Sequence, residues 1–100
     1  MKVSDLVGAM ATIAPLNLAE SWDRVGLLVG DERRPLAGPI VLTIDLTEAV
    51  LEEAAGLKAS ALVAYHPPIW EPLKSLTTAT ARGRILLRAV EAGMAIYCPH

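Results

Sequence analysis

The stretch from Ser60 to Trp70, SALVAYHPPIW, decides the fold, because it joins a short apolar run to a rigid polar loop. The run from Ala61 to Ala64 is typical of a buried strand. Pro67 and Pro68 cannot donate ladder hydrogen bonds and therefore end that strand. In open α/β sheets, ligands bind at the carboxyl ends of the strands. The sequence thus predicts a site centred on His66.

The preceding segment predicts a strand–helix–strand unit that ends in this stretch. Residues Ile40–Ile44, IVLTI, are rich in β-branched side chains and are typical of a strand. Thr47 is a suitable cap for a helix that runs to about Leu57, where Gly56 and Lys58 favour a helix end. The following strand, Ala59–Ala64, would then lie parallel to the first, since the helix is long enough for a crossover.

The remaining segments complete an alternation of helices and strands. They predict a helix over Ser4–Ala14 with Ser4 as its cap, a strand over Val25–Val29, a helix from Ala79 or Thr80 to Ala92, and a strand over Met94–Cys98. The order indicates one α/β domain over residues 1–100, with three layers and a mainly parallel sheet flanked by helices.

Composition narrows the classes of partner. Nine basic and eleven acidic residues give a net charge of −2, and they are scattered rather than clustered as a nucleic-acid footprint requires. We therefore expect no direct nucleic-acid binding. The hydrophobic fraction of 53% is high for so short a chain. It predicts apolar surface that meets a further domain or a partner subunit.

The single cysteine and the N-terminal sequence predict a reducing, cytoplasmic environment. Cys98 allows no intrachain disulfide, which fits a reducing environment, and its apolar surroundings favour a core position over a nucleophilic role. No apolar stretch reaches the roughly 18 residues that span a membrane. The N-terminus, MKVSDLVGAM, is a poor signal peptide. We expect a cytoplasmic protein without membrane contact.

Three polar residues stand at three predicted strand ends: Asp45, His66 and His100. If those strands are parallel in one sheet, their side chains converge on one rim, where a carboxylate and two imidazoles suit Zn, Mn, Fe, Co or Ni. Taken alone, such an Asp is more often a cap or turn residue, and such a His a surface or core residue. The neighbouring Tyr65 could donate a hydrogen bond or simply cover the strand end.

Four motifs in this order resemble one family, the NIF-three-like dinuclear metal-binding proteins, whose members are often named GTP cyclohydrolase I type 2 homologues. The motifs are WDRVGLLVG at 22–30, DLTE at 45–48, YHPPIW at 65–70 with PLK at 72–74, and AIYCPH at 95–100. The family commonly has W-D-N-V-G-L-L-V-G at the first motif, and its last strand leads into His-Thr-x-x-Asp. The likeness covers almost the whole chain.

The resemblance implies a pair of divalent metals bound at the rim. In much of the family two adjacent histidines each hold one metal; here the second is His66, and Tyr65 replaces the first, which changes one of the two metal positions. His100 would line the site. The family's remaining ligands, an Asp four positions later and a distal His and Glu, have no counterpart within these 100 residues. We therefore expect the N-terminal portion of a longer protein that binds metal weakly when isolated.

Two functions from different classes follow. The first is a metal-dependent hydrolase in which His100 or Asp45 transfers protons, acting on a nucleotide or phosphoester. Because the sequence has no P-loop, a nucleotide would be held mainly by the metals. The alternative is a non-catalytic metal-binding scaffold or regulatory interaction protein, since family members resemble toroidal homo-oligomers. A metal-free nucleotide-binding domain would need a glycine-rich turn where residues 45–48 stand.

Overall fold

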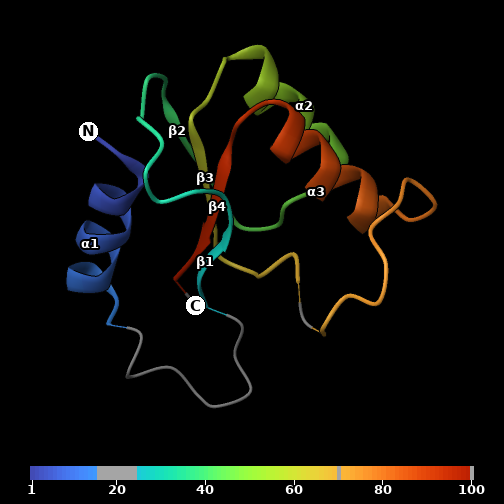
Figure 1. The fold of residues 1–100 in the computed structure, drawn as a ribbon, viewed down its shortest axis with the longest axis horizontal. Coiled ribbons are helices and arrows are strands. Elements are labelled where there is room, and N and C mark those ends of the chain that lie inside the picture. Colours follow the sequence, from blue (N-terminus) through green and yellow to red (C-terminus); the bar gives the residue numbers. More distant parts are fainter. Residues whose placement is uncertain (16–24, 70, 100) are drawn as a thin grey trace.

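The computed structural model describes residues 1–15, 25–69 and 71–99. Its elements in chain order are α1 Val3–Ile13, β1 Gly26–Val29, β2 Ile40–Thr43, α2 Glu48–Gly56, β3 Ala61–Ala64, α3 Ala81–Glu91 and β4 Ala95–Cys98. The strands lie in the order β1-β4-β3-β2, with β2, β3 and β4 parallel and β1 antiparallel to β4. The predicted α/β fold with a mainly parallel sheet is confirmed (Figure 1).

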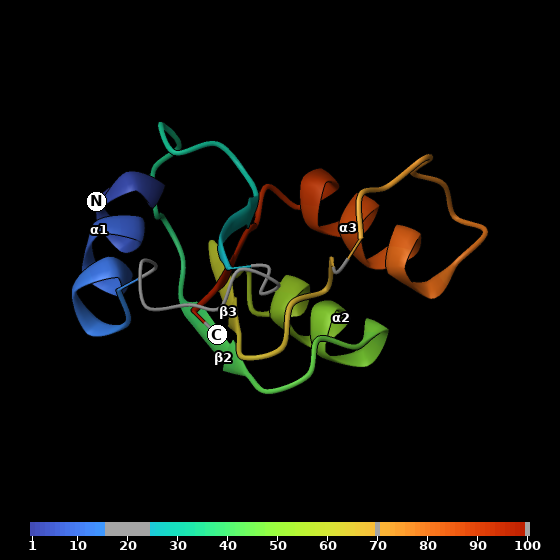
Figure 2. The same cartoon turned by 90° about the horizontal axis from the view of Figure 1, so that it is seen from below.

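Helices cover the sheet on both faces. α1 lies on one face, and α2 and α3 lie together on the other, as two perpendicular views show (Figures 1 and 2). Side chains of β3 and β4 alternate between the two layers: Leu62 and Ile96 pack with α2 and α3, whereas Val63 and Tyr97 pack with α1. Both strands are buried throughout, as expected of central parallel strands.

Two of the helices begin at threonine caps. The Thr47 hydroxyl accepts a hydrogen bond from the backbone N–H of Val50 at 3.2 Å, so the predicted cap of α2 is confirmed. The Thr80 hydroxyl accepts one from the N–H of Gly83 at 3.0 Å at the start of α3. Each bond satisfies one of the donors that a helix leaves unpaired in its first turn.

The prediction that Ser4 caps the first helix is wrong. α1 begins at Val3, and the N–H of its cap residue, Lys2, donates to the carboxylate of Asp5 at 2.7 Å. The N–H groups of Val3 and Ser4 donate to backbone carbonyls of the 31–39 loop at 2.8 and 2.9 Å. The helix starts one residue before Ser4, and backbone carbonyls of the loop, rather than a serine side chain, accept the N–H groups at its start.

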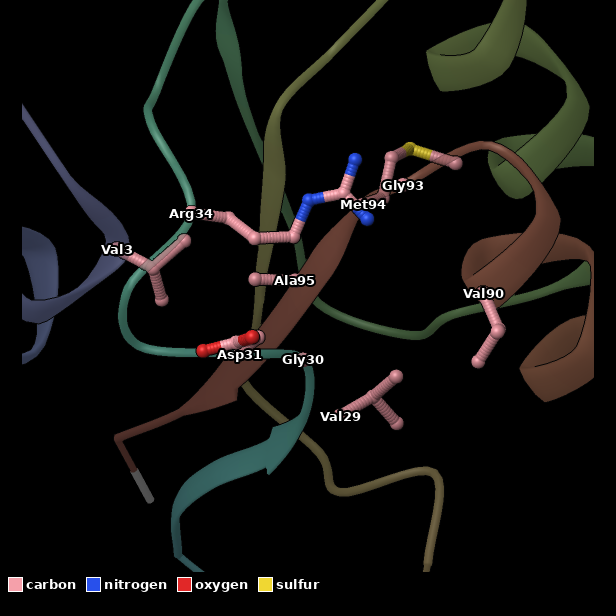
Figure 3. Close-up of a pocket in the computed structure, with 9 residues that line it drawn as sticks. All are labelled: Val3, Val29, Gly30, Asp31, Arg34, Val90, Gly93, Met94 and Ala95. Atoms are coloured by element: carbon pink, nitrogen blue, oxygen red, sulfur yellow. The ribbon is translucent and has the colours of Figure 1, made fainter.

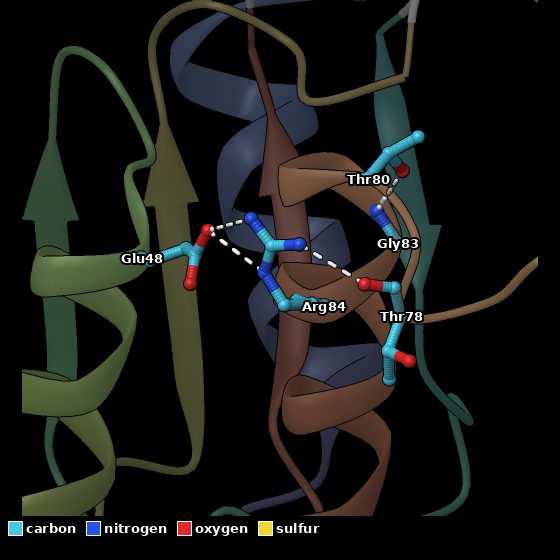
Figure 4. Close-up of polar contacts among 5 residues, drawn as sticks. All are labelled: Glu48, Thr78, Thr80, Gly83 and Arg84. Atoms are coloured by element: carbon cyan, nitrogen blue, oxygen red, sulfur yellow. Dashed lines mark hydrogen bonds and ion pairs between the residues drawn. The ribbon is translucent and has the colours of Figure 1, made fainter.

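Ion pairs join α2 to α3 along their exposed faces. Arg84 donates to the Glu48 carboxylate at 2.8 and 3.1 Å and to the carbonyl oxygen of Thr78 at 3.0 Å (Figure 4). Arg88 donates to Glu52 at 3.0 Å, one turn further along both helices. Exposed pairs of this kind contribute little energy, so we assign them to the alignment of the two helices. Within the described residues, no helix has the length and apolar character to span a membrane.

Candidate functional site

The carboxyl ends of β2 and β3 place Asp45 and His66 side by side. Parallel pairing continues past the regular strands, because the N–H of Tyr65 donates to the carbonyl of Thr43 and that of His66 to the carbonyl of Ile44, both at 2.9 Å. β2 ends at Thr43, one residue before the predicted end, although its hydrogen-bonded pairing with the next segment extends to Ile44. Both polar residues consequently leave the sheet at the same rim.

The two side chains are in direct contact. His66 Nδ1 and Asp45 Oδ1 are 2.7 Å apart, although 21 positions separate the residues in sequence. A carboxylate at this position favours the tautomer that carries its proton on Nδ1, which leaves the ring lone pair on Nε2. The Thr43 hydroxyl donates to the Asp45 carbonyl at 2.9 Å and holds the turn that carries the carboxylate. The predicted convergence of Asp45 and His66 is confirmed.

An open hollow of about 470 Å³ extends from this pair. Its polar side consists of Asp45, His66 and Arg82, and its apolar side is formed by Leu46, Pro67, Pro68 and Ile85. Arg82 belongs to the first turn of α3 and is remote in sequence from both other polar residues. Sequence reasoning missed it, because nothing in the local pattern around Arg82 distinguishes it from the other arginines of that helix.

Tyr65 lies next to the pair and is tied to β4. Its ring centroid is 5.1 Å from that of His66, with the planes tilted by 46°, and its side chain is half-exposed. Its backbone carbonyl accepts a hydrogen bond from the Cys98 thiol at 3.3 Å. Cys98 is buried, which confirms the predicted core position. The end of β4 therefore reaches the same rim as β2 and β3.

The other residues singled out in the sequence lie outside the described residues. They are His100, Trp22 and Asp23 with the first part of the WDRVGLLVG motif, and Trp70. Within residues 1–15, 25–69 and 71–99, no three His, Cys, Asp or Glu side chains form a cluster that could hold a metal ion. What the described part provides is one imidazole with an orienting carboxylate, and this donor set fits one ligand of a divalent metal.

A second pocket, of about 270 Å³, lies near the amino end of β4 (Figure 3). Val3, Val29, Val90 and Met94 supply its apolar wall, and Arg34 reaches across Ala95 toward Gly93. Its carboxylate, Asp31, is paired with Arg33 at 3.1 Å. This pocket contains none of the residues predicted for the site.

Comparisons with known proteins agree on one family. The family model Duf34/NIF3 (NGG1p interacting factor 3) matches residues 1–100. The chain is 44% identical to NIF3-like protein 1 of Rattus norvegicus over 100 residues, which is the whole chain and 27% of that protein. It is 34% identical to the GTP cyclohydrolase 1 type 2 homolog of Clostridium perfringens, covering the whole chain and 38% of that protein.

The fold agrees as well. The crystal structure of a Bacillus cereus protein related to NIF3 superimposes with a TM-score of 0.92 at 31% identity, over 100% of this chain and 27% of that one. The chain thus spans about a quarter of the length of the rat and Bacillus proteins that it matches. Because the family model covers every residue, the chain belongs to the Duf34/NIF3 family.

Proposed function

We propose that this chain contributes part of a divalent-metal site in a metal-dependent hydrolase, with His66 as a metal ligand. One observation carries the proposal: the 2.7 Å contact between Asp45 Oδ1 and His66 Nδ1. Metal-binding histidines almost always donate their other ring N–H to a carboxylate, a carbonyl or a water, which fixes the ring and raises its basicity. The name of the Clostridium relative, a GTP cyclohydrolase 1 type 2 homolog, supports a hydrolytic reaction on a nucleotide.

Asp45 acquires a more specific role than proton transfer. Its contact with Nδ1 makes it the residue that positions His66, and its negative charge stabilises a positive charge on the ring or beyond it. When bound, a divalent cation would supply Lewis acidity and activate water near neutral pH. His100, which lies outside the described residues, stays a predicted proton-transfer residue.

Tyr65 occupies the place of the first of the two metal-binding histidines in the family motif. A phenol must lose its proton to bind a cation, whereas a neutral imidazole binds as it is. We therefore expect the position at Tyr65 to bind metal more weakly than the one at His66. The identity of the metal among Zn, Mn, Fe, Co and Ni depends on the ligands that join His66.

The second candidate, a metal-binding oligomeric scaffold, is favoured by an exposed apolar strip on β2. Ile40, Leu42 and the following Ile44 have exposed fractions of 41%, 75% and 65%. Ile40 and Leu42 pair in register with Ala61 and Val63, so they lie on the same face of the sheet as α1. On that face α1 packs against β3 and β4 and leaves the β2 side chains exposed. Contiguous exposed apolar side chains are typical of protein–protein contacts, and they support the predicted homo-oligomer.

Turnover measurements on the full-length protein distinguish the two candidates. A panel of phosphoesters and nucleotides is incubated with Mn²⁺ or Zn²⁺, using the wild type and His66→Ala. Metal-dependent turnover that His66→Ala abolishes supports the hydrolase. An absence of turnover across the panel, with oligomer size that changes in His66→Ala, supports the scaffold instead.

A further inference from the structure

Arg82 differs from the other arginines of α3 in its surroundings. Arg84 and Arg88 each donate to a glutamate of α2, at 2.8 and 3.0 Å (Figure 4 shows the first pair). Arg82 lines the hollow beside His66 and forms no ion pair with any residue in the described ranges. No described residue accepts a hydrogen bond from its guanidinium, and we infer that its N–H donors are available to a ligand in that hollow.

The chemistry of the hollow indicates what such a ligand carries. A guanidinium presents donors in a planar fork that matches the oxygens of a phosphate group. The apolar side of the hollow, which includes Leu46 and Ile85, suits a flat or apolar part of the ligand next to its phosphate group. The Asp45 carboxylate in the same hollow opposes an anion, but its contact with His66 directs its charge toward the imidazole.

We propose that Arg82 binds a phosphate group of the substrate at this site and thereby selects phosphorylated over neutral ligands. This inference rests on the proposed function, since it assigns a ligand to the hollow that His66 lines. It changes one expectation from the sequence, in which a nucleotide is held mainly by the metals. In its place, a side chain of α3 supplies a direct contact that does not depend on the metal.

Calorimetric titration of the full-length protein tests the assignment. The probes are inorganic phosphate, acetate, guanosine and guanosine 5′-monophosphate, each titrated in metal-free protein and again with Mn²⁺. The variants are Arg82→Gln, Arg82→Lys and, as a matched control on the same helix, Arg88→Gln. Mn²⁺ is also titrated alone into every variant, so that metal binding is measured separately.

Arg82→Gln is expected to weaken binding of phosphate and of the monophosphate roughly 10- to 100-fold, the loss typical of a charged hydrogen bond. Guanosine and Mn²⁺ should bind as in the wild type, Arg82→Lys should recover part of the loss, and Arg88→Gln should change no probe more than about twofold.

The proposal would be overturned by phosphate binding that Arg82→Gln leaves unaffected, by an equal loss in Arg88→Gln, or by acetate bound as tightly as phosphate. A wild type that binds no phosphate with or without Mn²⁺ would also overturn it. A wild type that does not bind Mn²⁺ would instead contradict the proposed metal site. The titrations of metal-free protein would still decide the role of Arg82.

Discussion

At the scale of single residues, Asp45 and His66 have different roles in the proposed metal site. The imidazole presents Nε2, and the carboxylate holds Nδ1 at 2.7 Å. The sequence alone could place both residues at strand ends, since β-branched runs and prolines mark those ends clearly. It could not show that the side chains touch, because the contact depends on the order of strands in the sheet and on the conformation of two loops.

Asp45→Ala is expected to weaken metal binding to the full-length protein by roughly 10- to 100-fold, since the ring loses the partner that fixes it. Asp45→Asn keeps an acceptor oxygen without the charge and should lose less. Metal titrations of both variants measure the effect. The matched control is Asp31→Ala, which removes a carboxylate paired with Arg33 in the second pocket. If Asp45→Ala binds the metal as tightly as the wild type, Asp45 does not position His66 for metal binding.

Tyr97 offers a test in the core that is independent of the site. Its side chain is fully buried, and its hydroxyl has no hydrogen-bond partner within the described residues. Burial raises the pKa of the Tyr97 phenol, so the group stays protonated. Because an unsatisfied buried hydroxyl costs about 1–3 kcal/mol, Tyr97→Phe should raise the free energy of unfolding by about 1 kcal/mol in urea denaturation. A loss of stability would mean that the hydroxyl has a partner.

At the scale of elements, the periodicity of the sequence predicted the helices and strands to within about two residues at most ends. Hydrophobic spacing and turn residues suffice for that, because they act locally. The capping of α1 was predicted wrongly, although the helix starts within one residue of the predicted position: its first donors bond to the 31–39 loop, and no local pattern reveals a partner about 30 positions away. The same limit hid Arg82, which reaches the hollow because α3 packs beside the ends of β2 and β3.

The first turn of α3 requires glycine at position 83. A Cβ on Gly83 would overlap the backbone carbonyl of Thr77, whereas a Cβ on Gly8 in α1 would meet open space. Gly83→Ala should therefore lower the free energy of unfolding by about 2 kcal/mol. Gly8→Ala should raise it by about 0.5–1 kcal/mol, since it only removes the entropic cost of glycine in a helix. Equal effects of the two variants in urea denaturation would contradict this packing.

The ion pair between Glu48 of α2 and Arg84 of α3 makes the free energy of unfolding depend on pH. The hydrogen bond from Arg84 lowers the pKa of the Glu48 carboxyl from its ordinary value of 4.5. The folded pKa is depressed, so the contribution is present above 4.5 and is lost as the pH falls through the folded value. Wild type should be slightly more stable than Glu48→Gln at pH 7, and the difference should vanish in acid and in high salt. A difference that grows as the pH falls would contradict the pairing.

At the scale of the whole molecule, these residues form one packed unit that also leaves apolar surface uncovered. The sheet is covered by α1 on one face and by α2 and α3 on the other (Figure 2). The strip on β2 that contains Leu42 remains exposed. The excess of apolar residues in the sequence predicted such a surface, although its place on the edge strand required the strand order.

The most direct test of the central claim is a crystal structure of the full-length protein grown with Zn²⁺, with anomalous data collected at the zinc edge. The account predicts an anomalous peak about 2.0–2.1 Å from His66 Nε2, with Asp45 still in contact with Nδ1. A peak bound to Nδ1, or zinc sites that leave His66 without a metal contact, would contradict it.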